Sequence, residues 1–238
     1  EFSFEELLEV FSPGDVLVVN ETKVIPRRLR GQNLNGEACF VLFVKDLGES
    51  RWEVLFPSKS KKNEELALPG GVRLRLEARG IPQIVQVSQM LDEHYFEKWG
   101  EAPLPPYILA RRASEPPKPE ITSQDKMWYQ SVLARVSGSI AAPTASLHFK
   151  KEDFAKLTKR GVQIQAVTLH VGMGTFNPVK SVDLNDHLIH EEEVHVSHLA
   201  WSAISKAKKI DAKIWALGTT VIRALESTAL GKLTENNK

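Results

Sequence analysis

The chain has 238 residues, of which 42% are hydrophobic, and a formal net charge of +1, which indicates a globular protein with a substantial core in one large domain or two smaller ones. The nearly neutral charge excludes a polycationic nucleic-acid coat, although a local basic face is compatible with it. The single cysteine excludes an internal disulfide and any multi-cysteine zinc or iron–sulfur site within the chain.

Neither a membrane span nor a signal peptide is predicted. No run approaches the roughly 20 apolar residues that cross a bilayer, and no signal-peptide pattern opens the chain. We therefore expect a cytoplasmic protein without a membrane partner. Cys39 has the apolar neighbours Phe40 and Val41 and is predicted to be a small buried residue.

The segment from about Glu37 to Ala78 has the pattern of short strands. Its pieces "ACFVLFVKD", "RWEVLFP" and "GVRLRLEA" are separated by Gly, Asn, Ser and Pro turns. The third piece alternates apolar and charged residues, so one face is dry and the other is wet. This alternation is typical of a small antiparallel barrel.

Prolines dominate the segment that follows. Pro105 and Pro106 fix their own φ and restrict the residue before them, which predicts a stiff, extended segment over Leu104 to Ile108. The polar, proline-rich stretch from Arg111 to Asp125 is predicted to be a flexible surface loop.

Beyond residue 148 the pattern changes to alternating strands and helices. The piece "KKEDFAKLTKRG" is a short helix ended by Gly161, and "VQIQAVTLHVGMGTF" begins as a strand rich in Val, Ile and Leu. His170 lies at the exit of this strand, which runs into Gly172, Gly174 and Thr175. Open α/β sheets place ligands at such strand ends, so this is the candidate site.

Three histidines and a glutamate lie close together in "NDHLIHEEEVHV", namely His187, His190, Glu192 and His195. Imidazoles and carboxylates are zinc or iron ligands, but the spacing lacks the HExxH signature, and we expect no metal. The alternatives are capping or pairing within an exposed segment, and polar contacts or proton carriers at the candidate site.

The last predicted unit, "IWALGTTVIRALEST", is a strand, a Gly-Thr-Thr turn and a helix. Thr219 or Thr220 is predicted to cap the helix with its hydroxyl, which leaves free N–H groups and the positive dipole end pointed at a ligand. A carboxylate or a phosphate is the expected guest. Ser197 is predicted to cap the helix "HLAWSAISKAKK" before it.

Six segments occur in the order of a known family: "PGDVLVVNETKVIPRRLRG", "GEAPLPPYI", "YQSVLARVSGSIAAPTASLHF", "VTLHVGMGTFNPV", "HLIHEE" and "ALGTTVIRALES". In these segments the chain resembles the S-adenosylmethionine:tRNA ribosyltransferase-isomerase family of queuosine biosynthesis. The resemblance and the change of pattern together predict a mixed α/β (α+β) main domain of residues 1–30 and 100–238. A small antiparallel β-barrel domain is predicted as an insertion at residues 31–99.

The resemblance implies transfer of the ribosyl part of S-adenosylmethionine onto 7-aminomethyl-7-deazaguanine at the wobble position of tRNA. Isomerisation would give epoxyqueuosine, with loss of adenine and methionine. S-adenosylmethionine would be a consumed co-substrate, with no permanently bound cofactor or metal, and the modified tRNA would be the partner of a monomeric enzyme. This chemistry needs a base, a proton donor and a dry pocket.

Residue roles follow from the matched motifs. His148 and His170 are the candidate acid or base residues; the alternative is that they hold loops through backbone hydrogen bonds. Glycines would let the backbone approach the ligand, and Thr219, Thr220 and Arg223 would receive the methionine carboxylate or an RNA phosphate. The substrate-binding candidates are Arg28, Pro143, Thr144, Gly172, Gly174, Thr175, His187, His190, Glu192, Gly218, Thr219, Thr220 and Arg223.

The chain also departs from the family pattern. Ser146 stands where the family has glycine, and we expect its side chain to narrow the approach to the pocket. The family's opening segment and a C-terminal section with an Asn-Phe-His-Leu-Pro motif do not occur in this sequence. The rival hypothesis is therefore a truncated, non-catalytic relative that binds S-adenosylmethionine or tRNA. An unrelated methyltransferase is less favoured, because its glycine-rich strand turn is not apparent.

Overall fold

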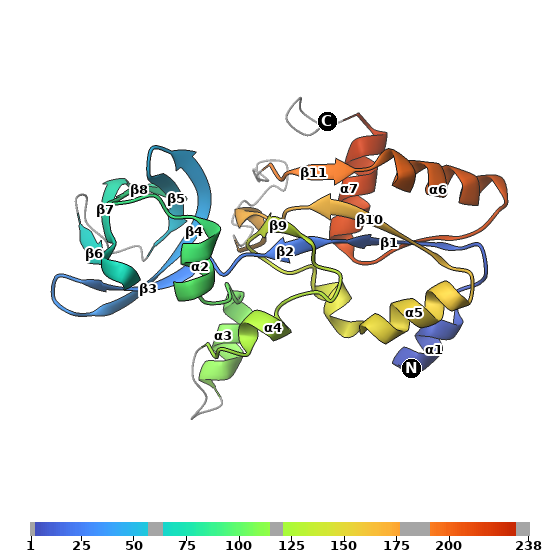
Figure 1. The fold of residues 1–238 in the computed structure, drawn as a ribbon, viewed down its shortest axis with the longest axis horizontal. Helices are drawn as coiled ribbons and strands as arrows, with labels where there is room; N and C mark the ends of the chain where they lie inside the picture. Colours follow the sequence, from blue (N-terminus) through green and yellow to red (C-terminus); the bar gives the residue numbers. More distant parts are fainter. Residues whose placement is uncertain (1–2, 57–63, 115–120, 177–190, 232–238) are drawn as a thin grey trace, which may run out of the picture. The chain divides into compact units, whose positions relative to one another are not determined.

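The computed structural model describes residues 3–56, 64–114, 121–176 and 191–231 (Figure 1). Its internal contacts divide the chain into two compact units. The first, called the α/β unit below, comprises Glu1–Val24, Trp128–Thr175 and Val179–Lys238; the second, called the barrel unit, comprises Ile25–Met127 and Phe176–Pro178. The predicted bounds of the inserted domain, 31–99, and of the main domain, 1–30 and 100–238, stay a prediction. No helix among the described residues is both long and apolar enough to cross a membrane.

The α/β unit is built on a four-stranded sheet with the strand order β11-β10-β1-β12. β1 is parallel to β10 and to β12, while β11 is antiparallel to β10. Every residue of β1 is buried, as expected for a central strand of a parallel sheet covered on both faces. The strands of this unit are β1 (Val16–Asn20), β2 (Thr22–Val24), β9 (Val136–Ser139), β10 (Gln163–Leu169), β11 (Val194–Val196) and β12 (Ile214–Ala216).

Helices cover both faces of this sheet. Leu17 and Val19 of β1 pack in one cluster with Phe154 and Leu157 of α5 and Leu8 of α1. Figure 1 shows α6 and α7 on the side of the sheet opposite α1 and α5. The helices are α1 (Phe4–Glu9), α5 (Lys151–Lys159), α6 (His198–Lys209) and α7 (Thr219–Ala229), with 3₁₀ turns at Thr144–His148 and Met173–Phe176.

Two predicted helix ends are confirmed. The Ser197 hydroxyl accepts a hydrogen bond from the N–H of Ala200 at 3.2 Å, so it caps α6. α5 ends at Lys159, and Gly161 follows with φ +87°, a left-handed conformation that glycine adopts without strain.

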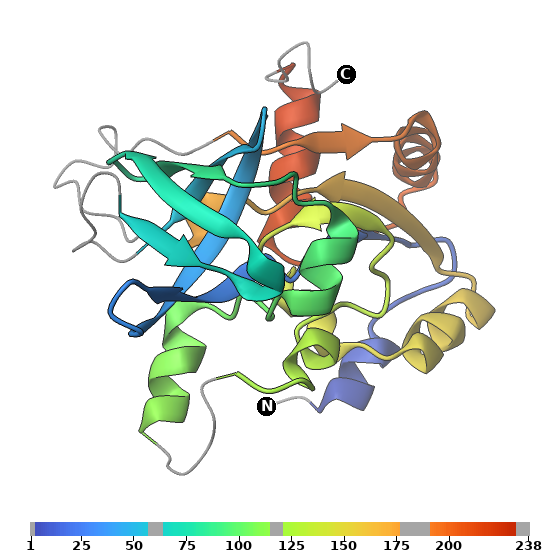
Figure 2. The ribbon, with the colours of Figure 1, turned by 60° about the vertical axis from the view of Figure 1, so that its left-hand side comes forward.

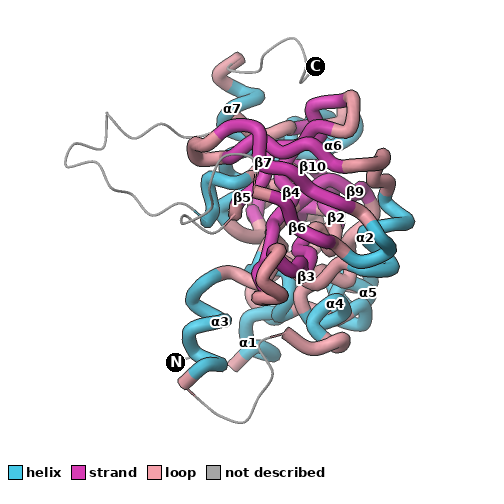
Figure 3. Tube along the Cα trace, turned by 90° about the vertical axis from the view of Figure 1, so that its left-hand side faces the viewer, coloured by secondary structure: helices cyan, strands magenta, loops and turns pink. Residues whose placement is uncertain are grey.

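The barrel unit confirms the predicted small antiparallel barrel. Its six strands close in the order β3-β4-β5-β8-β7-β6, and Figures 2 and 3 show the barrel from two sides. The elements are β3 (Arg28–Asn33), β4 (Ala38–Gly48), β5 (Arg51–Leu55), β6 (Glu65–Ala67), β7 (Arg73–Ala78), β8 (Gln83–Val87), α2 (Glu93–Trp99), α3 (Pro106–Ala113) and α4 (Asp125–Trp128), with a 3₁₀ turn at Pro69–Gly71.

The barrel core is closed by aromatic side chains. Phe43, Trp52 and Phe96 contact one another edge to face, with ring centroids 5.4 to 5.5 Å apart, so α2 contributes directly to the interior. Cys39 is half-buried at the edge of this core, where we expected a fully buried residue. Its β4 neighbours alternate between the barrel interior and the outside, which leaves the thiol only partly covered.

The chain enters and leaves the barrel at one point. Arg28, the first residue of β3, forms an isolated antiparallel bridge with Glu101, whose N–H donates to the Arg28 carbonyl at 2.7 Å. A Cβ on the adjacent Gly100 would lie 1.6 Å from the carbonyl oxygen of Pro26. The backbone segments are therefore in direct contact, and the crossing leaves no room for a side chain at position 100.

The expected extended segment over Leu104 to Ile108 is wrong in its second half. Pro105 is extended, with φ −66° and ψ 155°, but Pro106 is the first residue of α3. Proline suits this position because its fixed φ matches the helix and its missing N–H has no intrahelical partner there.

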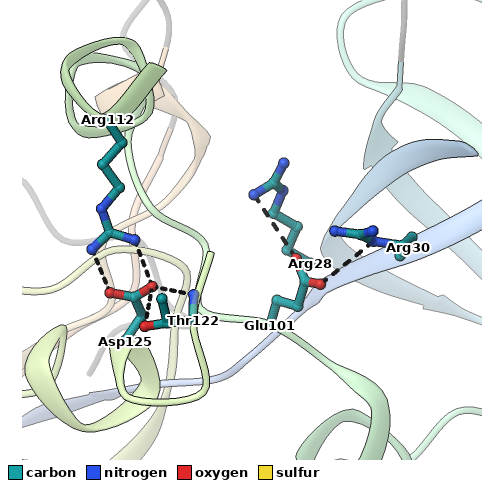
Figure 4. Close-up of polar contacts among 6 residues, drawn as sticks. All are labelled: Arg28, Arg30, Glu101, Arg112, Thr122 and Asp125. Atoms are coloured by element: carbon teal, nitrogen blue, oxygen red, sulfur yellow. Dashed lines mark hydrogen bonds and ion pairs between the residues drawn. The ribbon is translucent and has the colours of Figure 1, made fainter. Parts of the chain in front are cut away.

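The expected flexible loop over Arg111 to Asp125 is wrong at both ends, and residues 115–120 lie outside the described ranges. α3 continues to Ala113, and Asp125, only 1% exposed, begins α4. The Arg112 guanidinium donates two hydrogen bonds of 2.6 and 2.5 Å to the Asp125 carboxylate, which also accepts from the N–H and hydroxyl of Thr122 (Figure 4). A bidentate, buried ion pair therefore joins the two helices.

We predict that Arg112→Met destabilises the protein by about 2 to 4 kcal/mol at neutral pH, because the Asp125 carboxylate would stay buried without its counter-charge. The hydrogen bonds from Arg112 hold the pKa of Asp125 below its usual value. The stabilisation is thus complete above the unfolded-state pKa and is lost as the pH falls through the folded-state pKa. Urea unfolding at pH 7 and below pH 4 should show the difference from wild type shrinking in acid.

Arg51→Met is the matched control. Arg51 pairs with Glu77 at 3.0 Å, but their side chains are 44% and 29% exposed, so the expected loss is below about 1 kcal/mol. Equal losses for the two variants would contradict the stabilising role assigned to the Arg112–Asp125 pair.

Candidate active site

The predicted strand exit holds a histidine fixed by several contacts. β10 ends at Leu169, and His170 follows directly, with its backbone N–H donating to the Glu193 carbonyl at 2.9 Å. The side chain of His170 is half-buried, and its Nδ1 lies 2.7 Å from the hydroxyl oxygen of Thr22. His170 is therefore held by Glu193, the residue before β11, and by Thr22 of β2.

A buried asparagine orders this strand exit. The Asn20 amide donates to the Leu169 carbonyl at 3.0 Å and accepts from the Leu169 N–H at 3.1 Å. Its oxygen also accepts from the N–H of Thr22 at 3.1 Å. Both Asn20 and Thr22 are completely buried. The polar Asn20 at the end of an otherwise apolar strand was a signal in the sequence, but we did not assign it or Thr22 a role there.

A glycine packs against the imidazole ring. A Cβ at Gly138 of β9 would lie 2.6 Å from both Cε1 and Nε2 of His170, and 2.7 Å from Nδ1. The ring thus lies directly against the β9 backbone. We had not predicted Gly138 as a site residue. Because it has no side chain, the His170 ring can pack against the β9 backbone at this position.

Gly172, Glu192 and Arg223 form a second group beside His170. The Glu192 carboxylate accepts from the N–H of Gly172 at 3.0 Å and forms an ion pair of 2.7 Å with the Arg223 guanidinium. The Glu192 side chain is 4% exposed and that of Arg223 is 46% exposed. The buried carboxylate therefore holds a partly exposed cation on α7, next to the turn that follows β10.

The predicted cap of α7 is wrong. Gly218 is the N-cap residue and has no side chain that could cap the helix; Thr219 and Thr220 are its first two residues. Gly218 has φ +90°, and a Cβ there would lie 3.0 Å from Cβ of Ala145, so the turn requires glycine at the position where a threonine hydroxyl would have acted. With glycine as the N-cap, no N-cap side chain bonds the first N–H groups of α7, and helix N-termini of this kind suit anionic ligands.

The turn Thr144–His148 lies beside the start of α7 through the Ala145–Gly218 contact. Pro143 is buried, whereas Thr144 and His148 are exposed. The Ser146 hydroxyl is buried and donates to the Pro143 carbonyl at 2.6 Å. The Ser146 hydroxyl is thus paired within the turn, and the expected narrowing of the pocket stays a prediction.

The structure brings some of the predicted residues together within the α/β unit. His170, Gly172, Glu192, Gly218 and Arg223 belong to the connected group in the α/β unit. Gly174 is near them in sequence, and a Cβ there would meet no atom within 4 Å. The side chain of Thr175, and His187 and His190 entirely, lie outside the described residues.

Arg28 belongs to the barrel unit. Its guanidinium lies 3.8 Å from the centroid of the Phe40 ring and 4.0 Å from the Glu101 carboxylate (Figure 4). Arg30 approaches the same carboxylate at 3.8 Å. The two arginines thus share one aromatic ring and one carboxylate within the barrel unit.

The chemistry that this arrangement offers is anion binding beside an imidazole. An uncapped helix N-terminus and a tethered arginine suit a carboxylate or a phosphate, and a neutral imidazole can donate or accept a proton near pH 7. Within the described ranges, no three His, Cys, Asp or Glu side chains are grouped so that they could hold a metal ion.

The chain as a whole is similar to known proteins of one family. The family described as "Queuosine biosynthesis protein" matches residues 1–237. The chain is 37% identical over 228 residues to the S-adenosylmethionine:tRNA ribosyltransferase-isomerase of Sulfurihydrogenibium sp. (strain YO3AOP1), covering 94% of this chain and 65% of the relative. It is 39% identical over 241 residues to the protein of the same name from Halothermothrix orenii, covering 98% of this chain and 67% of the relative.

Among solved structures, the crystal structure of an S-adenosylmethionine tRNA ribosyltransferase from Thermotoga maritima matches with 28% identity and a TM-score of 0.36, covering 95% of this chain and 59% of that chain. The chain spans about two thirds of the length of the curated relatives, with 65% and 67% for the two named above.

We predict that Gly138→Ala displaces the His170 ring and destabilises the protein by about 1 to 3 kcal/mol, because the new methyl group overlaps the imidazole. Gly174→Ala is the matched control, where the methyl group meets open space and the expected change is within about 0.5 kcal/mol. Denaturant midpoints and the side-chain NMR signals of His170 measure both effects. An unshifted His170 signal in Gly138→Ala would contradict the packing described above.

Proposed function

The chain belongs to the queuosine biosynthesis protein family, and we propose that it is an S-adenosylmethionine:tRNA ribosyltransferase-isomerase. In this reaction the ribosyl moiety of S-adenosylmethionine is transferred to 7-aminomethyl-7-deazaguanine at the tRNA wobble position and isomerised, which gives epoxyqueuosine-tRNA, adenine and methionine. The observation that carries the proposal is the family match over residues 1–237. The names of relatives at 37% and 39% identity support it.

S-adenosylmethionine is a consumed co-substrate in this proposal, and no resident cofactor or metal takes part. The sulfonium acidifies the adjacent C5′, so a base can remove a proton there and the ribose ring can open with departure of adenine. The aminomethyl group of the modified base then attacks the sugar. The protein must bind both substrates in line, exclude water and supply the proton transfers.

The start of α7 is the proposed binding site for an anionic group of the substrates. The helix has no side-chain cap at Gly218, and Arg223 lies one turn into it, held by the buried Glu192. The methionine carboxylate or an RNA phosphate would accept from the N–H groups of Thr219 and Thr220 and from the Arg223 guanidinium.

His170 is the stronger of the two proposed acid or base residues. Its ring is fixed by Thr22 and Gly138, and a catalytic group needs a fixed orientation. His148 is exposed at the end of the turn beside α7 and is the second candidate. We further propose that the protein is a monomer in the cytoplasm, with the modified tRNA as its macromolecular partner.

The test is a chromatographic assay for free adenine and methionine. We expect the protein to release both from S-adenosylmethionine when an anticodon stem-loop with 7-aminomethyl-7-deazaguanine is present, and neither with the unmodified stem-loop. Release of S-adenosylhomocysteine would indicate methyl transfer. Intact S-adenosylmethionine, with binding demonstrated by calorimetry, would sink the enzyme proposal and favour a protein that only binds its ligands.

We predict that His170→Gln lowers kcat about 10²- to 10⁴-fold, because proton transfer or donation by a positioned side chain contributes in this range. His94→Gln, an exposed position on α2 of the barrel unit, is the control and should retain wild-type turnover. Steady-state kinetics of adenine release measures both. Equal turnover of His170→Gln and wild type would remove His170 from the reaction and leave His148 as the residue to test.

A further inference from the structure

We propose that Thr22 holds His170 in the neutral tautomer whose proton is on Nε2, so that Nε2 is a hydrogen-bond donor and His170 is not the base that removes the C5′ proton. Thr22 is then a positioning residue, because it acts through His170. The tautomer follows from contacts within the α/β unit, whereas its part in the reaction rests on the proposed function.

The contact between the two residues allows two arrangements. The hydroxyl oxygen of Thr22 lies 2.7 Å from Nδ1 of His170. Either the Thr22 hydroxyl donates to an unprotonated Nδ1, or a protonated Nδ1 donates to the hydroxyl oxygen. In a neutral ring the first arrangement puts the proton on Nε2, and the second leaves Nε2 unprotonated.

Burial distinguishes between these arrangements. Thr22 is 0% exposed, and among the described residues its hydroxyl contacts no acceptor other than His170. If Nδ1 were the donor, the hydroxyl hydrogen of Thr22 would be buried without an acceptor. The penalty for such a hydrogen favours the first arrangement about tenfold to a hundredfold.

Neighbouring contacts prevent the pair from separating to escape this penalty. Asn20 bonds the N–H of Thr22 and both backbone groups of Leu169, the residue before His170. On the other side the ring lies so close to Gly138 that a methyl group at position 138 would overlap it. Thr22 and the His170 ring are therefore held at bonding distance from both ends.

This arrangement limits what His170 can do. To act as a base at Nε2, the ring must first carry its proton on Nδ1. The hydroxyl hydrogen of Thr22 then has no acceptor, so the tautomer with an unprotonated Nε2 is little populated. In the favoured tautomer Nε2 carries the proton, so at this nitrogen the ring is a hydrogen-bond donor and not a base.

The first experiment measures the tautomer directly. Long-range ¹H–¹⁵N spectra of the full chain, labelled with ¹⁵N-histidine, distinguish protonated from unprotonated ring nitrogens, and His170→Gln assigns the signals. We expect an unprotonated, hydrogen-bonded Nδ1 and a protonated Nε2 at neutral pH. A protonated Nδ1 in the wild-type protein would overturn the proposal.

The second experiment tests the positioning role. Thr22→Val removes the hydroxyl at nearly constant volume and should shift the Nδ1 signal and lower kcat about tenfold to a hundredfold, with KM little changed. Thr22→Ser keeps the hydroxyl and should restore both the signal and most of kcat. Thr158→Val is the control, because the Thr158 hydroxyl only donates to the Phe154 carbonyl within α5.

The outcomes separate this inference from the proposed function. If the wild-type protein is active and Thr22→Val has the same kcat as Thr158→Val, the positioning role of Thr22 is overturned. A wild-type protein with the expected tautomer but without release of adenine would leave the tautomer standing and refute the proposed reaction. The wild-type spectrum and Thr22→Ser decide the matter even if Thr22→Val fails to fold.

Discussion

The Asn20 side chain is the contact on which the candidate site depends. It lies at the end of the central strand β1, wholly buried, and bonds both backbone groups of Leu169 as a neighbouring strand residue would. The same oxygen bonds the N–H of Thr22, so β1 turns into β2 at a fixed point. An amide that satisfies three buried backbone groups is costly to replace, because any apolar substitute would leave all three without partners.

From this contact the remaining geometry follows in steps. The ladder between β1 and β10 ends at the Asn20–Val167 pair, and just beyond Leu169 the His170 ring lies against Thr22 and Gly138. Two residues later the N–H of Gly172 is bonded by Glu192, and Glu192 in turn holds Arg223 on α7. The buried Asn20 amide thus connects β1 to the end of β10, and the buried Glu192 carboxylate connects the turn after β10 to α7.

The sequence predicted the parts of this site that depend on local pattern. The run of Val, Ile and Leu before His170 identified the strand exit, and the Gly-Thr-Thr turn identified the start of α7. Thr22, Asn20 and Gly138 were missed because their roles arise from contacts with residues 148, 149 and 32 positions away in the chain. Sequence pattern carries little information at such separations.

The errors had local causes. The predicted threonine cap failed because the chain reverses at Gly218 in a left-handed conformation, which shifts the helix start by one residue. The extended stretch after Leu104 failed because Pro106 is equally suited to the first turn of a helix.

The contact between Arg28 and Glu101 also bears on how such a chain can have evolved. Because Arg28 and Glu101 are paired, the segment between them, which contains all six barrel strands, begins and ends at adjacent positions. A module with adjacent ends can be acquired, exchanged or lost through one short splice, without stretching the strands on either side of it. Gly100 lies against the Pro26 carbonyl, so any such exchange must keep a glycine at this position.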